Sequence, residues 1–86
     1  MRYLISYDLN MPGHDYQMLF DDLERLGAKR VLQSQWITPA LDETMTALAV
    51  RDRLWALMQY DDRLLVASLN STHWAGMNLM VQVSSV

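Results

Sequence analysis

The stretch YLISYDLNMPGHDY, residues 3–16, contains a change of hydrophobic period that decides the fold. Residues 2–9 alternate with a period of two, which predicts a strand. One face carries Tyr3, Ile5, Tyr7 and Leu9, and the other carries Arg2, Leu4, Ser6 and Asp8. The sequence Asn-Met-Pro-Gly at 10–13 is typical of a turn. A helical period begins at about Asp15, so the chain is predicted to start as strand, turn and helix.

The first helix is predicted to end at Gly27, where a glycine suits a left-handed C-cap. Asp15 lies at its positive N-terminal end, where a carboxylate is favourable. One apolar stripe at helical spacing marks the face that packs on the core. This stripe consists of Tyr16, Leu19, Phe20, Leu23 and Leu26.

Beyond Gly27 the sequence predicts two more strands and one more helix. Residues 29–38 alternate, but neither face is purely apolar, which favours an edge strand ending at Pro39. Thr46 is a predicted N-cap for a helix through Met58. Residues 61 and 62 are both aspartate, which breaks the helical pattern and indicates solvated side chains. Residues 63–70 are apolar on both faces, which favours a central strand.

The C-terminal part is predicted to hold a last strand, because apolar residues alternate over 77–83. A complete β-α-β-β-α-β order needs a hairpin within 36–46, with residues 36–38 and 44–46 as its two short strands. The pattern does not fix the path of 36–46 or of 71–86. The predicted class is α+β: one ferredoxin-like (split βαβ) domain over residues 1–86, with an antiparallel sheet and two helices on one face. The other face is left free, and Asp8 points to it.

The composition excludes several classes of protein. The chain has 86 residues, is 51% hydrophobic and 20% charged, and lacks cysteine, which indicates a globular domain without disulfides or thiolate metal sites. Its net charge of −3 and its single lysine argue against a general phosphate-binding surface. No signal peptide and no apolar run long enough to span a bilayer is evident, so a cytoplasmic location without a membrane partner is expected. A domain this small and rich in aromatic residues is expected to bury surface in an oligomer.

Five segments in order resemble one family. They are YLISYDL before the Pro-Gly turn, RVLQSQWI, VRDRL, DDRLLVASL and WAG, and they fall within residues 2–76. The set resembles the SinR-like proteins, which are related to the small CRISPR-associated endoribonuclease of the spacer-acquisition complex. The resemblance implies a ferredoxin-like homodimer that buries the sheet face opposite the helices. It also implies that Asp8 of each protomer flanks a Mg²⁺ ion across the two-fold axis. Those relatives bind duplex nucleic acid with basic surfaces, from which this acidic chain departs.

Asp8 is the candidate catalytic residue and metal ligand. Two carboxylates held close across a symmetry axis either share a proton or bind a divalent cation. A bridging Mg²⁺ ion positions and activates water for attack on a phosphodiester. The alternative is a turn cap, with Asp8 accepting hydrogen bonds from the amides of residues 10 or 11. Both interpretations stay open at the level of the sequence.

The other candidates also have two interpretations each. Ser6 and Asn10 are candidate partners of Asp8 or ordinary strand and turn residues. Four residues are candidate nucleic-acid contacts or, alternatively, solvated side chains of an edge strand: Lys29, Arg30, Gln33 and Ser34. His14 is a candidate general acid or base, whereas His14 and His73 lack the spacing of a zinc site. The three tryptophans, Trp36, Trp55 and Trp74, are stacking platforms for bases or, more simply, packing residues.

Two functions follow from these candidates. The first is a homodimeric, Mg²⁺-dependent endonuclease or nucleic-acid-processing protein that works through paired Asp8 carboxylates. The second is a non-catalytic dimer that binds a protein partner, as a scaffold of a defence or toxin–antitoxin system. The distribution of cations discriminates between them, because nucleic-acid binding needs a basic ridge. The residues that would have to converge are Lys29, Arg30, Arg51, Arg53 and Arg63.

Overall fold

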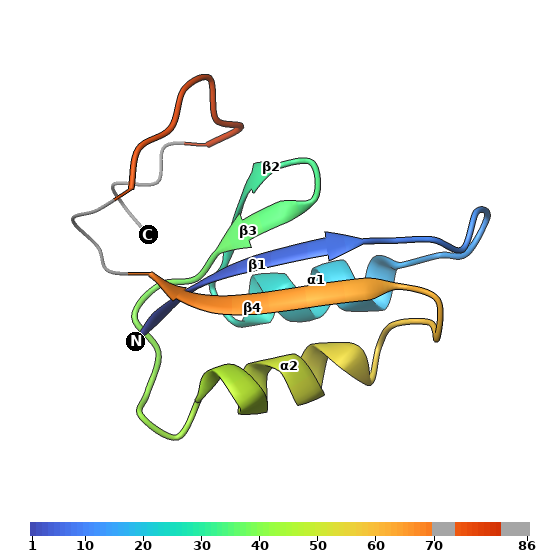
Figure 1. Ribbon diagram of the computed structural model, residues 1–86, viewed down its shortest axis with the longest axis horizontal. Coiled ribbons are helices and arrows are strands. Elements are labelled where there is room, and N and C mark those ends of the chain that lie inside the picture. The colour runs from blue at the N-terminus through green and yellow to red at the C-terminus, as the bar shows by residue number, and fades with distance from the viewer. Residues whose placement is uncertain (70–73, 82–86) are drawn as a thin grey trace.

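A computed structural model describes residues 1–69 and 74–81 of the chain. Within these residues the elements follow the order β-α-β-β-α-β (Figure 1). They are β1 (Arg2–Asp8), α1 (Gln17–Arg25), β2 (Lys29–Leu32), β3 (Gln35–Ile37), α2 (Ala47–Trp55) and β4 (Arg63–Leu69). Among them, no helix is both long and apolar enough to cross a membrane.

The four strands form one open sheet in the order β2-β3-β1-β4, and every neighbouring pair is antiparallel. The longest ladder joins β1 to β4, from Arg2 opposite Leu69 to Asp8 opposite Arg63. On its other side β1 pairs with β3, with Ile5 opposite Trp36. The predicted α+β class is therefore confirmed as a four-stranded antiparallel sheet with two helices.

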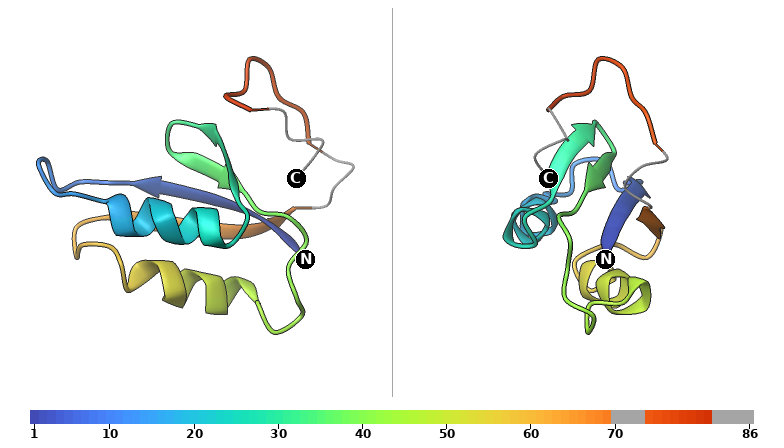
Figure 2. Two further views of the ribbon diagram at one scale, coloured as in Figure 1. Left: turned by 180° about the vertical axis from the view of Figure 1, so that it is seen from behind. Right: turned by 90° about the vertical axis from the view of Figure 1, so that its left-hand side faces the viewer.

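Both helices lie on the same face of the sheet (Figures 1 and 2). The alternation of β1 decides which face this is, because its odd-numbered residues are buried against the helices. From the helices, Leu19 and Leu23 of α1 and Val50 and Leu54 of α2 are almost completely buried. The same cluster includes Tyr3, Ile5, Tyr7, Leu26, Ala28, Trp36 and Met58. This layer is the main hydrophobic core.

A second, smaller cluster lies on the sheet face without helices. Val31 of β2 and Ile37 of β3 are buried there, with Leu4 and Leu69 packed beside them. They are covered by residues 74–81, which contribute Trp74 and Leu79 and follow an irregular path (Figure 1). We call residues 74–81 the strap.

The predicted N-cap of the second helix and the glycine that follows the first helix are confirmed, but the second helix ends at Trp55 and not at the predicted Met58. The Thr46 hydroxyl accepts a hydrogen bond from the amide of Ala49 at 3.1 Å, as an N-cap should. Gly27 follows α1 with a φ of +80°, which glycine adopts without the penalty that a Cβ would impose. Asp15 accepts from the amide of Gln17 at 2.9 Å and so binds the start of α1.

The prediction of one strand over 29–38 is wrong, because this segment is a complete hairpin. The chain turns at Gln33 and Ser34, and β2 returns as β3. Tight two-residue turns usually carry Gly or Asn at positive φ, yet neither residue has a positive φ here. Instead, the register of the β2–β3 pair shifts between Arg30 and Leu32, as it does at a bulge or a similar irregularity. Residues 44–46, which were predicted to be the returning strand, are not a strand.

Two further predictions about strands are corrected. β4 was expected in the centre of the sheet, but it lies at the edge. Within the described residues β4 has a strand on one side alone, and that strand is β1. Residues 77–81 form bends rather than the predicted last strand, while residues 82 and 83 lie outside the described residues. The strap contains Asn78 at a φ of +55°, a conformation that interrupts any extended path.

Candidate functional site

Asp8 ends β1 on the face of the sheet that has no helices. It shares this face with Leu4, because strand residues two apart point the same way. Its cross-strand neighbour is Arg63, with 3.8 Å between Asp8 Oδ2 and Arg63 Nη1. The two side chains are 63% and 80% exposed, so this ion pair is weak. Asp8 is therefore open to solvent and to a further partner.

The carboxylate that binds the turn after β1 belongs to Asp62, not to Asp8. Asp62 Oδ1 accepts a hydrogen bond from the amide of Asn10 at 2.7 Å, while the Asn10 side-chain amide donates to the carbonyl of Asp61 at 2.9 Å. Within the described residues, the contact of the Asp8 carboxylate is with Arg63. Asp8 therefore does not cap the turn through the Asn10 amide, because Asp62 already accepts from that amide.

Asp62 joins three segments of the chain, although the sequence indicated a solvated side chain. Its Oδ1 also accepts from the Tyr16 hydroxyl at 2.8 Å, and its Oδ2 accepts from the amide of Gln59 at 2.7 Å. Burial alone would raise the pKa of Asp62, but the hydrogen bonds from Asn10, Gln59 and Tyr16 lower it below its ordinary value. Burial and this carboxylate together raise the pKa of Tyr16. Asp62 is therefore a charged structural link beneath the candidate site.

A hollow of about 340 Å³ opens beside the end of β1. It brings together several residues singled out from the sequence, although they come from β1, the following loop and the β2–β3 hairpin. Its lining consists of Tyr7, Asp8, Leu9, Asn10, Arg30, Gln33 and Ser34. Asp8 and the candidate nucleic-acid contacts Arg30, Gln33 and Ser34 thus share one site. Lys29 and Ser6 are not part of this lining.

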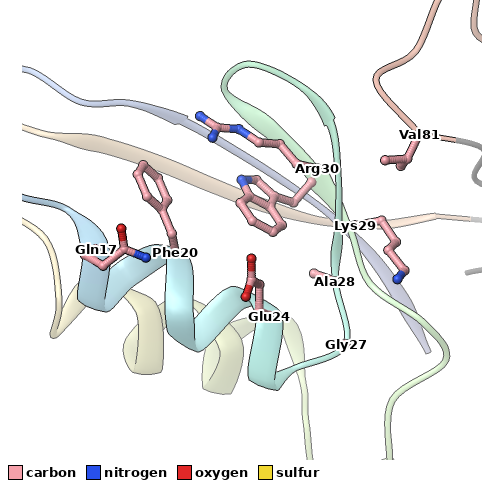
Figure 3. Close-up of a pocket in the computed structure, with 9 residues that line it drawn as sticks. Gln17, Phe20, Glu24, Gly27, Ala28, Lys29, Arg30 and Val81 are labelled. Atoms are coloured by element: carbon pink, nitrogen blue, oxygen red, sulfur yellow. The ribbon is translucent and has the colours of Figure 1, made fainter.

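Arg30 separates that hollow from a larger groove of about 610 Å³ between α1 and the hairpin. Figure 3 shows Phe20 and Glu24 projecting from α1 toward the strand that carries Arg30. The Arg30 guanidinium lies 4.9 Å from the ring centre of Phe20 and 5.7 Å from that of Trp36. Its Nε and Nη2 donate to the carbonyl of Gln33. Arg30 therefore covers the two rings and fixes the hairpin turn, which makes the rings packing residues rather than open platforms.

Tyr7 also contacts the turn of the β2–β3 hairpin. Its hydroxyl accepts a hydrogen bond from Trp36 Nε1 at 3.0 Å and lies 3.4 Å from the carbonyl of Gln33, to which it donates. Tyr7 and Trp36 are each 4% exposed. Removal of the hydroxyl therefore leaves the indole N–H buried without its acceptor.

We expect Tyr7→Phe to lower the free energy of unfolding by about 1–2 kcal/mol, measured by urea unfolding. Tyr60→Phe is the matched control, because Tyr60 is 85% exposed and its change should stay within about 0.5 kcal/mol. Equal effects of the two changes would show that the Tyr7 hydroxyl does not stabilise the fold.

The five cations named from the sequence do not form one basic ridge. Arg53 binds Asp22 across the two helices through two hydrogen bonds, of 2.8 and 2.9 Å, and this contact raises the pKa of Arg53. Arg51 pairs with Asp52 at 2.7 Å, and both line a hollow on the α2 side together with Arg63. Lys29 and Arg30 line the groove beside α1 instead. The cations thus fall into three groups, and carboxylates neutralise several of them.

The histidine and tryptophan candidates take other places. His14 lies edge-on to Tyr16, and its Nε2 is 3.2 Å from Nε2 of Gln59. His73 lies outside the described residues. Trp36 belongs to the main core, Trp74 packs on the second cluster, and Trp55 is 41% exposed. Within residues 1–69 and 74–81, no group of three or more His, Cys, Asp or Glu side chains could hold a metal ion.

No protein-family model matches the chain. The candidate site therefore stands on its own geometry: an exposed carboxylate, Asp8, on the face of a sheet that the helices do not cover.

Proposed function

We propose that this protein is a homodimer of ferredoxin-like protomers, related in function to the small CRISPR-associated endoribonuclease. In this proposal the Asp8 carboxylates of two protomers meet across a two-fold axis and hold one Mg²⁺ ion. The protein is then a metal-dependent endonuclease or a nucleic-acid-processing protein. The β-α-β-β-α-β order and the helix-free sheet face support the class, because this is the element order of a split βαβ fold.

The state of Asp8 carries the proposal. A carboxylate at the end of a strand usually binds a nearby turn, but here Asp62 takes the Asn10 amide. Asp8 keeps a weak, exposed contact with Arg63. Asp8 is thus left available on the face that a second protomer would approach.

The donor atoms fit Mg²⁺ only if two chains contribute. Mg²⁺ prefers oxygen ligands and commonly keeps several waters while binding one or two carboxylates. One described chain offers Asp8 without a second acidic side chain in the hollow beside it. Two copies of Asp8 would supply two carboxylates, and Asn10 would stand beside each of them in that hollow. When bound, the metal supplies a Lewis acid and a water of lowered pKa.

Calorimetric titration with Mn²⁺ as the probe tests this arrangement. We expect one ion to bind per two chains, and Asp8→Asn to weaken binding at least tenfold. The matched control is Asp61→Asn, since Asp61 is also exposed and changes the net charge equally. A stoichiometry of one ion per chain, or equal binding by Asp8→Asn and wild type, would contradict the shared site.

Cleavage of labelled RNA and DNA, single- and double-stranded, then tests the chemistry. We expect cleavage that requires Mg²⁺, stops with a chelator and is lost in Asp8→Asn. The Asp61→Asn variant should cleave like wild type. Cleavage that survives in Asp8→Asn would indicate a contaminating nuclease or another site.

One observation favours the second candidate function, a non-catalytic dimer that binds a protein partner. Arg51, Arg53 and Arg63 each pair with a carboxylate, so the surface offers little unneutralised positive charge for a phosphate backbone. Mn²⁺ binding without cleavage of any nucleic acid, or a dimer that binds no metal, would favour this function.

A further inference from the structure

The helix-free face of the sheet is divided between two environments. At one end, the strap covers Leu4, Val31, Ile37 and Leu69 with the side chains of Trp74 and Leu79. The other end contains Ser6, Gln35 and Leu65 with the Asp8–Arg63 pair. The large apolar side chains of this uncovered end are Leu65, which is 59% exposed, and Leu32, which pairs with Gln35 and is 42% exposed. The strap thus occupies the more apolar half of the face and leaves the more polar half open.

The open half is too small to support a stable dimer. Four strands spaced about 4.8 Å apart give the patch a width of roughly 15 Å, and half of a seven-residue strand gives it a length of roughly 12 Å. A stable interface buries about 800 Å² per partner and has an apolar centre. The apolar residues that would supply this centre lie under the strap. A second copy that brings the two Asp8 residues together would gain an apolar centre for its interface by taking the place of the strap.

Few contacts hold the strap against the sheet. Met80 donates a backbone hydrogen bond to the carbonyl of Val31 at 2.9 Å, and Trp74 and Leu79 supply the apolar contact. The indole N–H of Trp74 is buried and finds no hydrogen-bond acceptor among the described residues. Burial of an unpaired donor is costly, so it favours release of the strap. The side chains of Met77 and Met80 add little to the attachment, because they are 84% and 58% exposed.

We propose that the strap and a second copy of this chain compete for the helix-free face, so that displacement of the strap controls dimerisation. This inference rests on the dimer of the proposed function and adds its regulation. With the strap closed, the protein is a monomer whose Asp8 stands alone. With the strap displaced, the apolar half of the face becomes the centre of the interface and the Asp8 carboxylates pair.

Gly76 offers a way to loosen the strap without touching the face beneath it. A Cβ at Gly76 would lie 2.7 Å from Cδ1 of Leu79 and 3.0 Å from its Cγ, which is too close for both to keep their places. Gly76→Ala therefore forces the Leu79 side chain to shift and weakens its contact with the second cluster. Because both protomers must open, a fivefold rise in the open fraction should lower the apparent dimer Kd about 25-fold.

Analytical ultracentrifugation of the full chain over a range of concentrations measures this Kd. We expect Gly76→Ala to form dimers at concentrations where wild type is monomeric. Leu48→Ala, on the exposed side of α2, is the control and should match wild type. A thermal melt by circular dichroism checks that Gly76→Ala is folded. A dimer that is unchanged or weaker in Gly76→Ala would overturn the competition.

Hydrogen exchange supplies a second readout that does not depend on any substitution. The Met80 amide is hydrogen-bonded to Val31, so a peptide that covers residues 74–81 should contain one protected amide, that of Met80, in the monomer. We expect this peptide to exchange faster as wild type dimerises, whereas an interface normally slows exchange. Slower exchange of the strap in the dimer would overturn the inference, because it would place the strap inside the interface.

Leu65→Arg separates failure of this inference from failure of the proposed dimer. Leu65 lies on the uncovered half of the face, so a charge there should block dimerisation whether or not the strap competes. If Leu65→Arg blocks a dimer that Gly76→Ala leaves unchanged, the dimer stands and the competition fails. If wild type and Gly76→Ala are both monomeric at all concentrations, both proposals fail.

Discussion

Replacement of Asp62 with alanine is expected to lower the free energy of unfolding by about 3 kcal/mol. Asp62 is 6% exposed and accepts hydrogen bonds from the amides of Asn10 and Gln59 and from the Tyr16 hydroxyl. Each hydrogen bond to a charged acceptor contributes roughly 1.5–3 kcal/mol, and water replaces part of the three when the side chain is removed. The loop after β1 and the loop after α2 then lose their common anchor.

Urea unfolding at pH 7 measures this effect, and the thermal midpoint should fall by roughly 12–24 °C. Asp61→Ala is the matched control, because Asp61 is the neighbouring residue and its side chain is exposed. Its free energy of unfolding should change by no more than about 0.5 kcal/mol. Asp62→Asn should lie between the two, since its one remaining oxygen can accept from Asn10 and Tyr16 but not also from Gln59. If Asp62→Ala and Asp61→Ala were equally stable, the link between the two loops would contribute nothing.

The lowered pKa of Asp62 predicts that the stability of the fold depends on pH. The folded pKa of Asp62 is lowered, so its contribution is complete above the ordinary carboxyl pKa of about 3.9. The contribution disappears as the pH falls through the lower folded pKa. The stability difference between wild type and Asp62→Asn should therefore be constant from pH 7 to about pH 5 and shrink below about pH 4. Asp42, whose pKa is also lowered by its bonds to Thr44, is present in both proteins and cancels.

The helices were predictable from the sequence because their signals are local. Thr46 as an N-cap and Gly27 after the first helix both depend on backbone groups within a few residues. The apolar stripes of the helices likewise indicated the buried faces, such as Leu19 and Leu23 in α1.

The β2–β3 hairpin could not be predicted in the same way. Gln33 and Ser34 carry no turn signal, and the alternation of residues 29–38 continues through them. The turn is instead held by the side chain of Arg30, which bonds to the carbonyl of Gln33, and by the hydroxyl of Tyr7. The bond from Tyr7 joins segments 26 residues apart, and the bond from Arg30, although local, follows no known turn pattern.

The candidate site shows the same division between local and long-range signals. The sequence singled out Asp8 correctly as a carboxylate at the end of β1 on the free face. It could not assign the nearby turn amide to Asp62, which follows 52 residues after Asn10. Two adjacent aspartates after a helix are ordinarily solvated, and only the packing of the two loops makes one of them structural. The place of β4 at the sheet edge was missed because both of its faces are covered in part, one by α2 and the other at Leu69 by the strap.

Leu54→Ala should also lower the free energy of unfolding by about 3 kcal/mol. Leu54 is completely buried, and it belongs to the cluster in which α2 meets α1 and β1. Truncation removes three carbons from the core, and the surrounding side chains cannot fully collapse into the space because they come from different elements.

Leu48 provides a matched control on the same helix. It is 58% exposed, so Leu48→Ala removes the same atoms with a change within about 0.5 kcal/mol. Urea unfolding of both variants at one pH measures the difference, and an unchanged slope would show that the unfolded states are alike. Similar losses from the two substitutions would mean that α2 does not bury the face described here. The sheet would then lack its support beneath β1 and β4, the two strands whose ends carry Asp8 and Arg63.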